Sequence, residues 1–289
     1  MVAFGTHLKL YVKQGTSYYD VTPLRTTTSA GDVTFSATDG DATITVTDAS
    51  HGAVVNDFVT FSGAASLGGL ITANVLNQEY QIASVTSTNV YTVEAKDTDG
   101  NTVTANSSDS GNGGSSVVGA YQINTGLDSY VSGSGYSSGY WGQSSWGGGT
   151  YGFASQLRLW TLDNFGEDLI SCPRLGQIYY WDLSGGVTTR AIPLSSLSDA
   201  ADTPTAAMQV LVSEKDRHVV ALGANTIGTS TQDPMLVRWS DQEDAGMWTP
   251  KTTNTAGSLR LSAGSEIIGG VRTRQEIAIF TDVALYSMQ

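Results

Sequence analysis

A chain of 289 residues is long enough to bury a sizeable core in one or two domains. Only 14% of its residues are charged and 33 are glycine, a composition typical of β-sheets joined by many turns, which argues against a helical protein. The formal net charge of −13 argues against a protein that binds the phosphates of nucleic acid, because such binding depends on Lys and Arg side chains. Solubility explains the charge most simply, although a surface past which nucleic acid slides without sticking would also need it.

The first predicted elements are two short strands around a turn within residues 2–12, followed by a strand at 18–24 that Pro23 ends. A similar outline recurs at residues 169–182, 218–241 and 276–288. In each copy an apolar strand is followed by a turn and then by a strand that carries Tyr or Trp. The equivalent positions in the four copies are Tyr11, Tyr180, Arg238 and Tyr286.

These positions recur roughly every 50 residues once two apparent insertions, at residues 32–118 and 126–150, are taken out. A four-stranded propeller blade takes about 40–50 residues, so the spacing favours a β-propeller. The predicted fold class is therefore all-β, with propeller-like repeated hairpins or blades in an incomplete set and an inserted small β-module. A sandwich of irregular hairpins is the alternative.

The first insertion, residues 32–118, alternates apolar and polar residues in short runs separated by turns such as Asp39-Gly40 and Asp99-Gly100. This pattern predicts a small β-barrel or β-sandwich that stands off the main body. The domain division is then a first propeller segment at 1–31, the inserted module at 32–118, a loop at 119–150 and the remaining blades at 151–289.

The loop is rich in glycine and serine, yet it also carries several large aromatic side chains. A flexible linker would not usually contain so many rings, whereas rings on an adaptable backbone suit a contact with another subunit. A loop that packs back on its own domain is the alternative. The candidate residues for the subunit interface are Tyr130, Tyr136, Tyr140, Trp141 and Trp146.

Cys172 is the only cysteine, which excludes an internal disulfide and suits a reducing compartment such as the cytoplasm. It lies in an apolar run, so a buried and unreactive thiol is predicted. No apolar run is long enough to span a bilayer.

Two acidic stretches, residues 39–41 and 97–100, resemble fragments of calcium-binding loops. The second would need an acidic residue where Ser108 stands, and the first lacks one as well, so both are predicted to be Asx turns of hairpins. The histidines have no partner at the spacing of metal ligands and are predicted to be turn or strand residues. They are His7, His51 and His218, and the sequence predicts neither a metal site nor a cofactor.

Paired carboxylates could hydrolyse glycosides if two of them faced each other across a cleft. The carboxylates available for this are Asp163, Glu167, Asp168, Asp241, Glu243 and Asp244. Sugar platforms could come from Trp181, Trp239 and Trp248, although at equivalent places in repeated strands these rings are better explained as core between blades.

The segment 244–248, Asp-Ala-Gly-Met-Trp, nearly matches the aspartate box of sialidase-type propellers, which has the form Ser-x-Asp-x-Gly-x-x-Trp. One residue is missing between the glycine and the tryptophan, and the motif occurs once. In those families the box is structural, so the segment predicts a propeller turn and does not indicate catalysis.

The run Arg238-Trp-Ser-Asp-Gln-Glu-Asp-Ala-Gly-Met-Trp-Thr-Pro250, with residues 256–269 and 273–289, resembles the tail hub, or nozzle, proteins of short-tailed bacteriophages. These are also called packaged-DNA stabilisation proteins. Residues 2–12 and 18–24 fit the same group. The resemblance covers most of residues 1–31 and 151–289.

The resemblance implies a β-propeller subunit in a homo-oligomeric ring, a hexamer, that forms the distal tail tube below the portal and its adaptor proteins. Such a ring would retain the packaged genome until DNA ejection, and DNA would pass its lumen without specific binding. Tail spikes or fibres would attach at its side and a needle or plug protein at its tip. The resemblance implies no catalytic residue, assembly in the host cytoplasm and a location in the virion tail. Such proteins run well beyond this point, so the resemblance implies either that further chain follows Gln289 or that other chains complete the propeller.

Residues 49–63 and 76–82 of the first insertion are similar to a small β-barrel module often inserted in phage structural proteins. That module was first named for a half-domain of ubiquitin-activating enzymes, and only its shape is expected here.

Two other functions remain open at this point. A carbohydrate-binding or glycoside-hydrolysing propeller would need a pocket that holds two carboxylates beside an exposed Trp. A cell-surface β-protein would assemble into sheets and not into rings.

Overall fold

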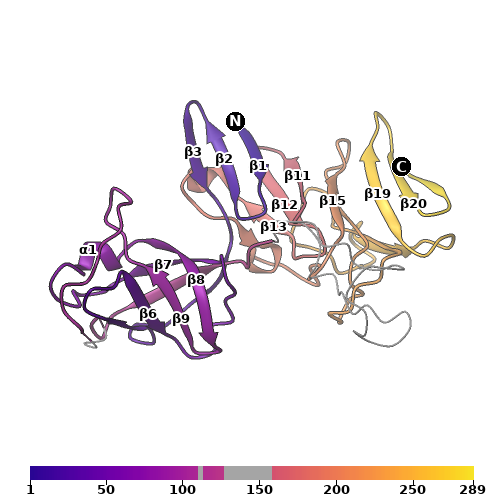
Figure 1. Cartoon of the computed structure of the whole chain (residues 1–289). Coiled ribbons are helices and arrows are strands. Elements are labelled where there is room, and N and C mark those ends of the chain that lie inside the picture. Colours follow the sequence, from indigo (N-terminus) through magenta and orange to yellow (C-terminus); the bar gives the residue numbers. More distant parts are fainter. Residues whose placement is uncertain (110–112, 127–157) are drawn as a thin grey trace, which may run out of the picture. The chain divides into compact units, whose positions relative to one another are not determined.

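The computed structural model describes residues 1–109, 113–126 and 158–289. These residues form two compact units, one of residues 1–23 and 126–289, here called the blade unit, and one of residues 24–125, here called the inserted module (Figure 1). Nearly all regular structure in both units is β, and the strands pair antiparallel. In the described ranges no helix has the length and apolar character to cross a membrane.

The described residues of the blade unit form four antiparallel sheets, in each of which neighbouring strands follow one another along the chain. This arrangement confirms the prediction of propeller-like repeated blades. The first sheet has β1 (Val2–Gly5), β2 (Leu10–Gln14) and β3 (Ser17–Asp20), and the second has β11 (Trp160–Phe165), β12 (Asp168–Pro173), β13 (Tyr179–Trp181) and β14 (Ile192–Pro193). The third has β15 (Gln209–Val212), β16 (Val219–Leu222), β17 (Leu236–Trp239) and β18 (Gly257–Arg260), and the fourth has β19 (Ile267–Arg272), β20 (Ile277–Thr281) and β21 (Leu285–Met288). Short 3₁₀ helices η2 (Leu183–Gly185) and η3 (Leu194–Ser196) flank β14.

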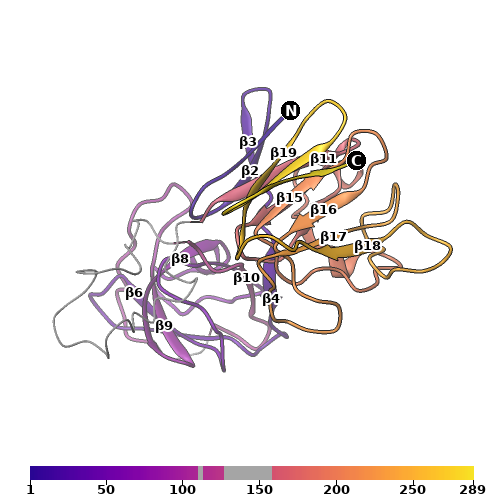
Figure 2. The ribbon, with the colours of Figure 1, turned by 90° about the vertical axis from the view of Figure 1, so that its right-hand side faces the viewer.

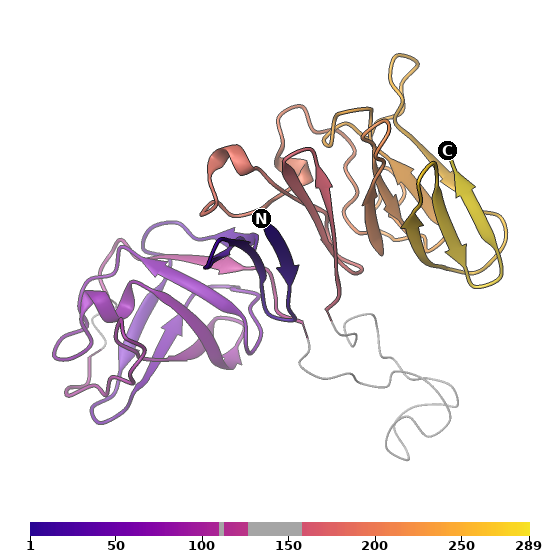
Figure 3. The same cartoon turned by 90° about the horizontal axis from the view of Figure 1, so that it is seen from above.

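The sheets of the blade unit stack face to face in chain order through their first strands. Strand β1 contacts β11, β11 contacts β15, and β15 contacts β19. Figure 3 shows the series from the indigo sheet β1–β3 to the yellow sheet β19–β21, and Figure 2 shows β15 to β18 side by side in the third sheet. The first and last sheets are therefore the two ends of an ordered stack.

Glycines allow the first strands to approach the neighbouring sheets closely. A Cβ atom on Gly5 of β1 would lie 2.1 Å from Cδ1 of Trp160 on β11, and one on Gly270 of β19 would lie 2.6 Å from Cδ1 of Leu222 on β16. Any side chain at these positions would push the sheets apart. The Trp160 indole N–H also donates to the Thr6 carbonyl oxygen at 2.8 Å, which ties the first sheet to the second.

The repeat assignment holds for three of the four copies. Tyr180, Arg238 and Tyr286 lie on β13, β17 and β21, the third strands of their sheets, but Tyr11 lies on β2, a second strand. The assignment of Tyr11 was wrong because both hairpins of a three-stranded meander fit the same pattern of apolar strand, turn and aromatic strand. In the first sheet the pattern matched the first hairpin, and in the others it matched the second.

The third sheet is covered on both faces. All four residues of β16 are fully buried. Val219 and Ala221 pack in a cluster with Ile170 and Cys172 of the second sheet. On the other face Val220 and Leu222 pack with residues of the fourth sheet, namely Ile267, Ile277 and Ile279.

The inserted module is one seven-stranded sheet with the strand order β4-β10-β7-β8-β9-β6-β5. The sheet curls around a single core, since Phe35 on β5 packs edge to face on Phe61 of β7 at a centroid distance of 4.9 Å. Its elements are β4 (Leu24–Thr27), β5 (Thr34–Ala37), β6 (Thr43–Thr47), β7 (Phe58–Ser62), α1 (Ala73–Leu76), β8 (Glu79–Ser87), β9 (Val90–Glu94) and β10 (Val118–Gln122).

The module is wider than the expected residues 32–118. Strand β4, which the sequence placed in the first propeller segment, pairs with β10 through Thr27–Ala120 and Thr26–Tyr121. Residues 119–125, which the sequence placed in the loop, belong to the same unit. The β4–β10 pair joins residues far apart in sequence, so no local pattern could reveal it.

Candidate functional site

The predicted interface residues fall in the part of the loop that the structure does not describe. Tyr130, Tyr136, Tyr140, Trp141 and Trp146 lie outside the described residues, and the interface prediction for them stays a prediction.

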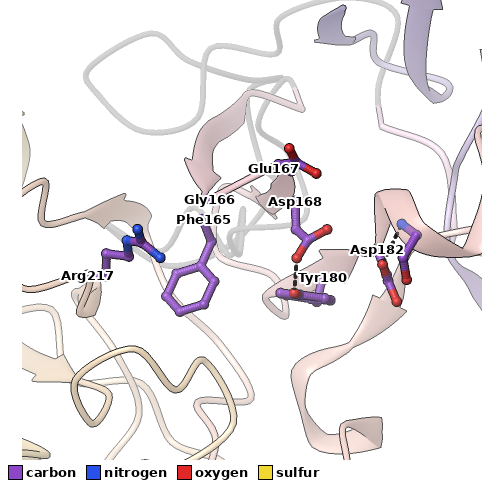
Figure 4. Close-up of a pocket in the computed structure, with 8 residues that line it drawn as sticks. Phe165, Gly166, Glu167, Asp168, Tyr180, Asp182 and Arg217 are labelled. Carbon is purple, nitrogen blue, oxygen red and sulfur yellow. Dashed lines mark hydrogen bonds between the residues drawn. The ribbon is translucent and has the colours of Figure 1, made fainter.

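An open depression of ≈ 610 Å³ lies beside the turn between β11 and β12 (Figure 4). Gly166 forms this turn at φ +69°, a backbone conformation that favours glycine. The turn brings two neighbouring carboxylates to the depression, and β13 and the residue after it supply Tyr180 and Asp182. Its lining residues are Phe165, Gly166, Glu167, Asp168, Tyr180, Asp182, Ser184 and Arg217.

Hydrogen bonds hold two carboxylates of the depression in place. Asp168 accepts a bond from the Tyr180 hydroxyl through Oδ2 and from the Leu183 backbone N–H through Oδ1, the latter at 3.0 Å. Burial, with the Asp168 bond and charge adding to it, raises the pKa of Tyr180, so this hydroxyl stays a donor. Asp182 caps η2 by accepting from the Ser184 N–H at 2.7 Å, and the hydrogen bonds from Ser184 lower its pKa. Both side chains thus have structural roles.

Aromatic rings form one wall of the depression. Phe165 and Tyr180 meet edge to face at a centroid distance of 6.4 Å. Both rings are half-buried, while Glu167 and Arg217 are exposed. The Arg217 guanidinium is 4.0 Å from a carboxylate oxygen of Glu243.

The other carboxylates proposed for glycoside chemistry are separate and bonded. Asp163 accepts from the Val212 N–H at 2.8 Å and pairs with Arg272 at 3.2 Å. Asp241 accepts from the Thr255 N–H at 2.9 Å. Of the six carboxylates, the depression brings together only Glu167 and Asp168, which are neighbours in sequence.

The tryptophans proposed as sugar platforms mostly form the core. Trp181 and Trp248 are 2% and 1% exposed, which confirms the interpretation as core. Trp239 is half-buried, packs against the cluster between the third and fourth sheets, and donates from its indole N–H to the Thr255 carbonyl oxygen at 2.8 Å.

The near-match to the aspartate box is a structural turn, as predicted. Asp244 accepts from the backbone N–H groups of Gly246 and Met247 at 2.8 and 3.2 Å. Trp248 is buried and its indole N–H donates to the Ala245 carbonyl oxygen at 2.8 Å.

The predictions for the two acidic turns, for His51 and His218 as turn or strand residues, and for Cys172 as a buried thiol are also confirmed. Asp41 and Asp97 accept backbone N–H bonds in hairpin turns. His51 and His218 bond to backbone groups near them. Cys172 is fully buried, and burial raises the pKa of its thiol to about 12. Across the described ranges, no group of three or more His, Cys, Asp or Glu side chains is arranged to hold a metal ion.

The repeat pattern aligns Arg238 with Tyr180 and Tyr286, but this alignment did not suggest the role that the structure shows for the arginine. It is 1% exposed, its guanidinium donates to the carbonyl oxygens of Asn225 (at 3.1 Å) and Asp202, and it lies 5.8 Å from the centroid of Trp248. Burial lowers its pKa, while the charge of Asp202 acts against that effect. Arg238 therefore fastens two loops to the third sheet.

Sequence reasoning missed the apolar face at the end of the stack. Residues Val271, Ala278, Phe280 and Leu285 project from one face of the fourth sheet, since Val271 pairs with Ala278 and Phe280 pairs with Leu285. We call these four residues the last-sheet face. Val271, Phe280 and Leu285 are 50%, 43% and 62% exposed.

The first sheet, at the other end of the stack, carries a face on which apolar and aromatic side chains lie beside Lys13 and, opposite Tyr11, Asp20. Val2, Lys13 and Tyr18 are neighbours across β1–β3, as are Phe4 and Tyr11. We call these five residues the first-sheet face. Its rings stack, with Phe4 5.6 Å from Tyr11 and 5.9 Å from Tyr18 between centroids, and Val2 and Tyr18 are 63% and 60% exposed. The apolar run Ile-Ala-Ile-Phe at 277–280 of β20 was the signal that could have pointed to apolar side chains on both faces of the fourth sheet.

No protein-family model and no curated protein matches the chain. Among solved structures, it is similar to the phage phi92 endosialidase, with a TM-score of 0.27 and 13% sequence identity. The similar region covers 96% of this chain and 40% of that one, so the chain spans less than half the length of that protein.

Proposed function

We propose that the protein is a structural subunit of a bacteriophage tail nozzle, in which copies of the chain form a ring around the path of the ejected DNA. The observation that carries this proposal is the ordered stack of blade-like sheets with an exposed apolar face at each end. A stack of this kind is suited to assembly, because each end offers a surface that another sheet can cover.

Exposed apolar faces support an assembly function on physical grounds. Monomeric proteins rarely expose large contiguous apolar patches, and those that do usually use them for binding. The side chains of both faces are held by regular strands, so little conformational entropy would be lost when a partner covers them. The resemblance of residues 238–289 to phage nozzle proteins supplies the biological setting.

The charge of the chain fits this function. With a net charge of −13, a ring of copies would repel the phosphates of DNA and let it pass without specific binding. Acidic residues are expected along the lumen, and a basic lumen would contradict this part of the proposal. The proposed neighbours are portal-adaptor proteins above the ring, spikes or fibres at its side, and a needle or plug at its tip.

Electron microscopy tests the proposal. Virions that contain the protein would be labelled with gold-conjugated antibody against the chain, and the purified full chain would be imaged by itself. The proposal predicts label at the tail and ring-shaped particles of the purified protein. Label on the capsid only, or extended sheets of protein, would contradict it.

A second candidate function is carbohydrate binding at the depression beside β11 and β12. The rings of Phe165 and Tyr180 beside Asp168 and Glu167 favour it, since rings and carboxylates are common in sugar-binding sites. A panel of acidic and neutral oligosaccharides would be tested with the chain and with Glu167→Gln, which changes an exposed side chain. Binding that this variant weakens would support the second function, and absence of binding across the panel would remove it.

A further inference from the structure

We propose that a second depression, formed by two loops beside the third sheet, binds a small carboxylate with a single negative charge against Arg238. The depression has a volume of ≈ 300 Å³, and Arg238 of β17 lines it together with residues of the loops 202–205 and 225–230. All of these residues belong to one chain, so the site goes beyond the nozzle function and does not depend on it.

The guanidinium of Arg238 has more donors than the surrounding protein satisfies. A guanidinium carries five N–H groups. Two of them donate to backbone carbonyl oxygens, those of Asn225 at 3.1 Å and of Asp202. The Nε–H is buried, and no acceptor among the described residues lies within hydrogen-bond distance of it. A buried donor of a charged group that lacks a partner is costly, so an acceptor bound in the depression would stabilise it.

The positive charge of Arg238 also lacks a direct partner. Arg238 is 1% exposed, and no carboxylate of the described residues forms an ion pair with it. Asp202 lines the same depression, but its carboxylate accepts a hydrogen bond from the Thr249 hydroxyl at 2.6 Å. Burial lowers the pKa of Arg238, and the charge of Asp202 only acts against this effect. Because buried charges are usually paired, the acceptor expected here is an anion.

The walls of the depression offer further donors and are held in place. The hydroxyl groups of Thr203, Thr205 and Ser230 make no hydrogen bond to another described residue, so they can donate to a ligand. Asn225 joins the two loops, since its side-chain oxygen accepts from the Thr205 N–H at 2.8 Å and its amide group donates to the Thr229 carbonyl oxygen at 2.7 Å. Walls that are fixed in this way need little ordering when a ligand binds.

The chemistry of the depression selects the class of ligand. The two oxygens of a carboxylate match the planar N–H groups of a guanidinium. A single negative charge is favoured, because the carboxylate of Asp202 and the net charge of −13 repel a second one. Ile227 adds an apolar side chain to the wall, which suits a short alkyl group. A short-chain monocarboxylate combines these features.

Nuclear magnetic resonance of the arginine Nε–H groups in the full chain tests the assignment. The Arg238 signal would be identified by its loss in Arg238→Lys, and acetate would be titrated at an ionic strength held constant with chloride. The expected result is a saturable shift of this signal with a dissociation constant of about 1 mM. An Arg238 signal that acetate leaves in place would overturn the proposal. A shift that phosphate produces at lower concentration than acetate would overturn the assigned class.

The same signal separates a free carboxylate from one that a second copy of the chain supplies. A shift that follows the protein concentration without acetate would overturn the proposal in favour of an acidic side chain of another copy. Loss of acetate binding would leave the nozzle function standing, and a chain that forms no ring would leave this site standing.

Variants of the walls keep the test decisive if Arg238→Lys does not fold. Thr203→Val and Ser230→Ala each remove one donor that no other described residue uses. Each should raise the dissociation constant for acetate about 10-fold, measured by isothermal titration calorimetry. Thr60→Val is the matched control, because Thr60 is half-buried like Thr203 but lies on β7 of the inserted module, and its affinity should be unchanged. Equal affinity in the wall variants and the control would overturn the proposal.

Discussion

The third and fourth sheets of the blade unit are built from the same kind of strand and differ in what covers them. Strand β16 has apolar residues on both faces, and all of them are buried between the second and fourth sheets. Strand β20 has the same apolar character, but Phe280 is 43% exposed while Ile279 is 2% exposed. The difference teaches that β20 has the composition of a strand covered on both faces, while among the described residues only its face with Ile277 and Ile279 is buried.

The strongest test of this comparison replaces one residue in each strand. Leu222→Ala should lower the free energy of unfolding of the blade unit by about 3 kcal/mol, because it opens a cavity in a covered interface. Phe280→Ala should change the stability of the isolated chain by less than about 1 kcal/mol, since that side chain already contacts water. Chemical denaturation followed by the fluorescence of the tryptophans measures both.

Equal losses in the two variants would mean that the two faces are equally covered, and the comparison would fail. The control for general damage is the spectrum of the folded protein before denaturation, which should be the same for both variants.

The equivalent positions Arg238 and Tyr286 give a second, smaller contrast. Arg238→Ala should lower the free energy of unfolding by about 2–3 kcal/mol, because it leaves the buried carbonyl oxygens of Asn225 and Asp202 without a donor. Tyr286→Phe should cost less, since it removes the acceptor of one exposed bond from the Ala263 N–H, 2.7 Å long. Differential scanning calorimetry of both variants checks the order.

An exposed arginine in the third sheet, the sheet that also carries Arg238, is the control for the loss of charge. Arg260 forms an ion pair with Asp233 at 2.7 Å, and its side chain is 62% exposed. Arg260→Ala should therefore change the stability by less than about 1 kcal/mol. If Arg260→Ala lowered the stability as much as Arg238→Ala does, the loss of positive charge, and not the loss of the hydrogen bonds to the two loops, would explain the effect.

The ion pairs that attach the first sheet to the second should contribute a smaller amount to the stability of the folded chain, and this contribution should depend on pH. Asp20 pairs with Lys9 at 3.0 Å and with Arg190 at 3.4 Å. Burial alone would raise its pKa, but the hydrogen bonds from Thr22 and the charges of Lys9 and Arg190 outweigh burial, so the pKa lies below its ordinary value of 3.8. The unfolded chain takes up the proton first as the pH falls, so this contribution is present above pH 3.8 and is lost as the pH drops through the folded pKa.

Asp20→Asn should therefore lower the stability by about 1–2 kcal/mol at pH 7 and flatten the loss of stability below pH 3.8. Thermal unfolding from pH 7 to pH 2.5 measures both. An acid profile that matches the wild-type profile would show that Asp20 does not anchor the sheet.

Much of the fold could be predicted from the sequence because the signals are local. Turn dipeptides, apolar alternation and aromatic third strands mark the hairpins, and the burial of Cys172 and Trp248 follows from their surroundings. The rest depends on contacts between distant segments. The β4–β10 pair that widens the module, the assignment of Tyr11 to a second strand and the loop contacts of Arg238 cannot be seen in a window of a few residues.

The candidate surfaces were harder to predict for a different reason. An apolar residue such as Phe280 looks the same in sequence whether its face is covered or exposed, and only the structure shows which of the described faces are exposed. Sequence reasoning favoured the aromatic loop, whose residues lie outside the described ranges, over the terminal sheets.

Hydrogen–deuterium exchange of the wild-type chain at a series of concentrations tests the central claim most directly. As the concentration rises, the amides of β19–β21 and β1–β3 should exchange more slowly, because a second copy covers these sheets, while the amides of β15–β18 should keep the same rate throughout. Exchange in β19–β21 that is equally fast at every concentration would contradict the claim that the sheets at the ends of the stack take part in the assembly.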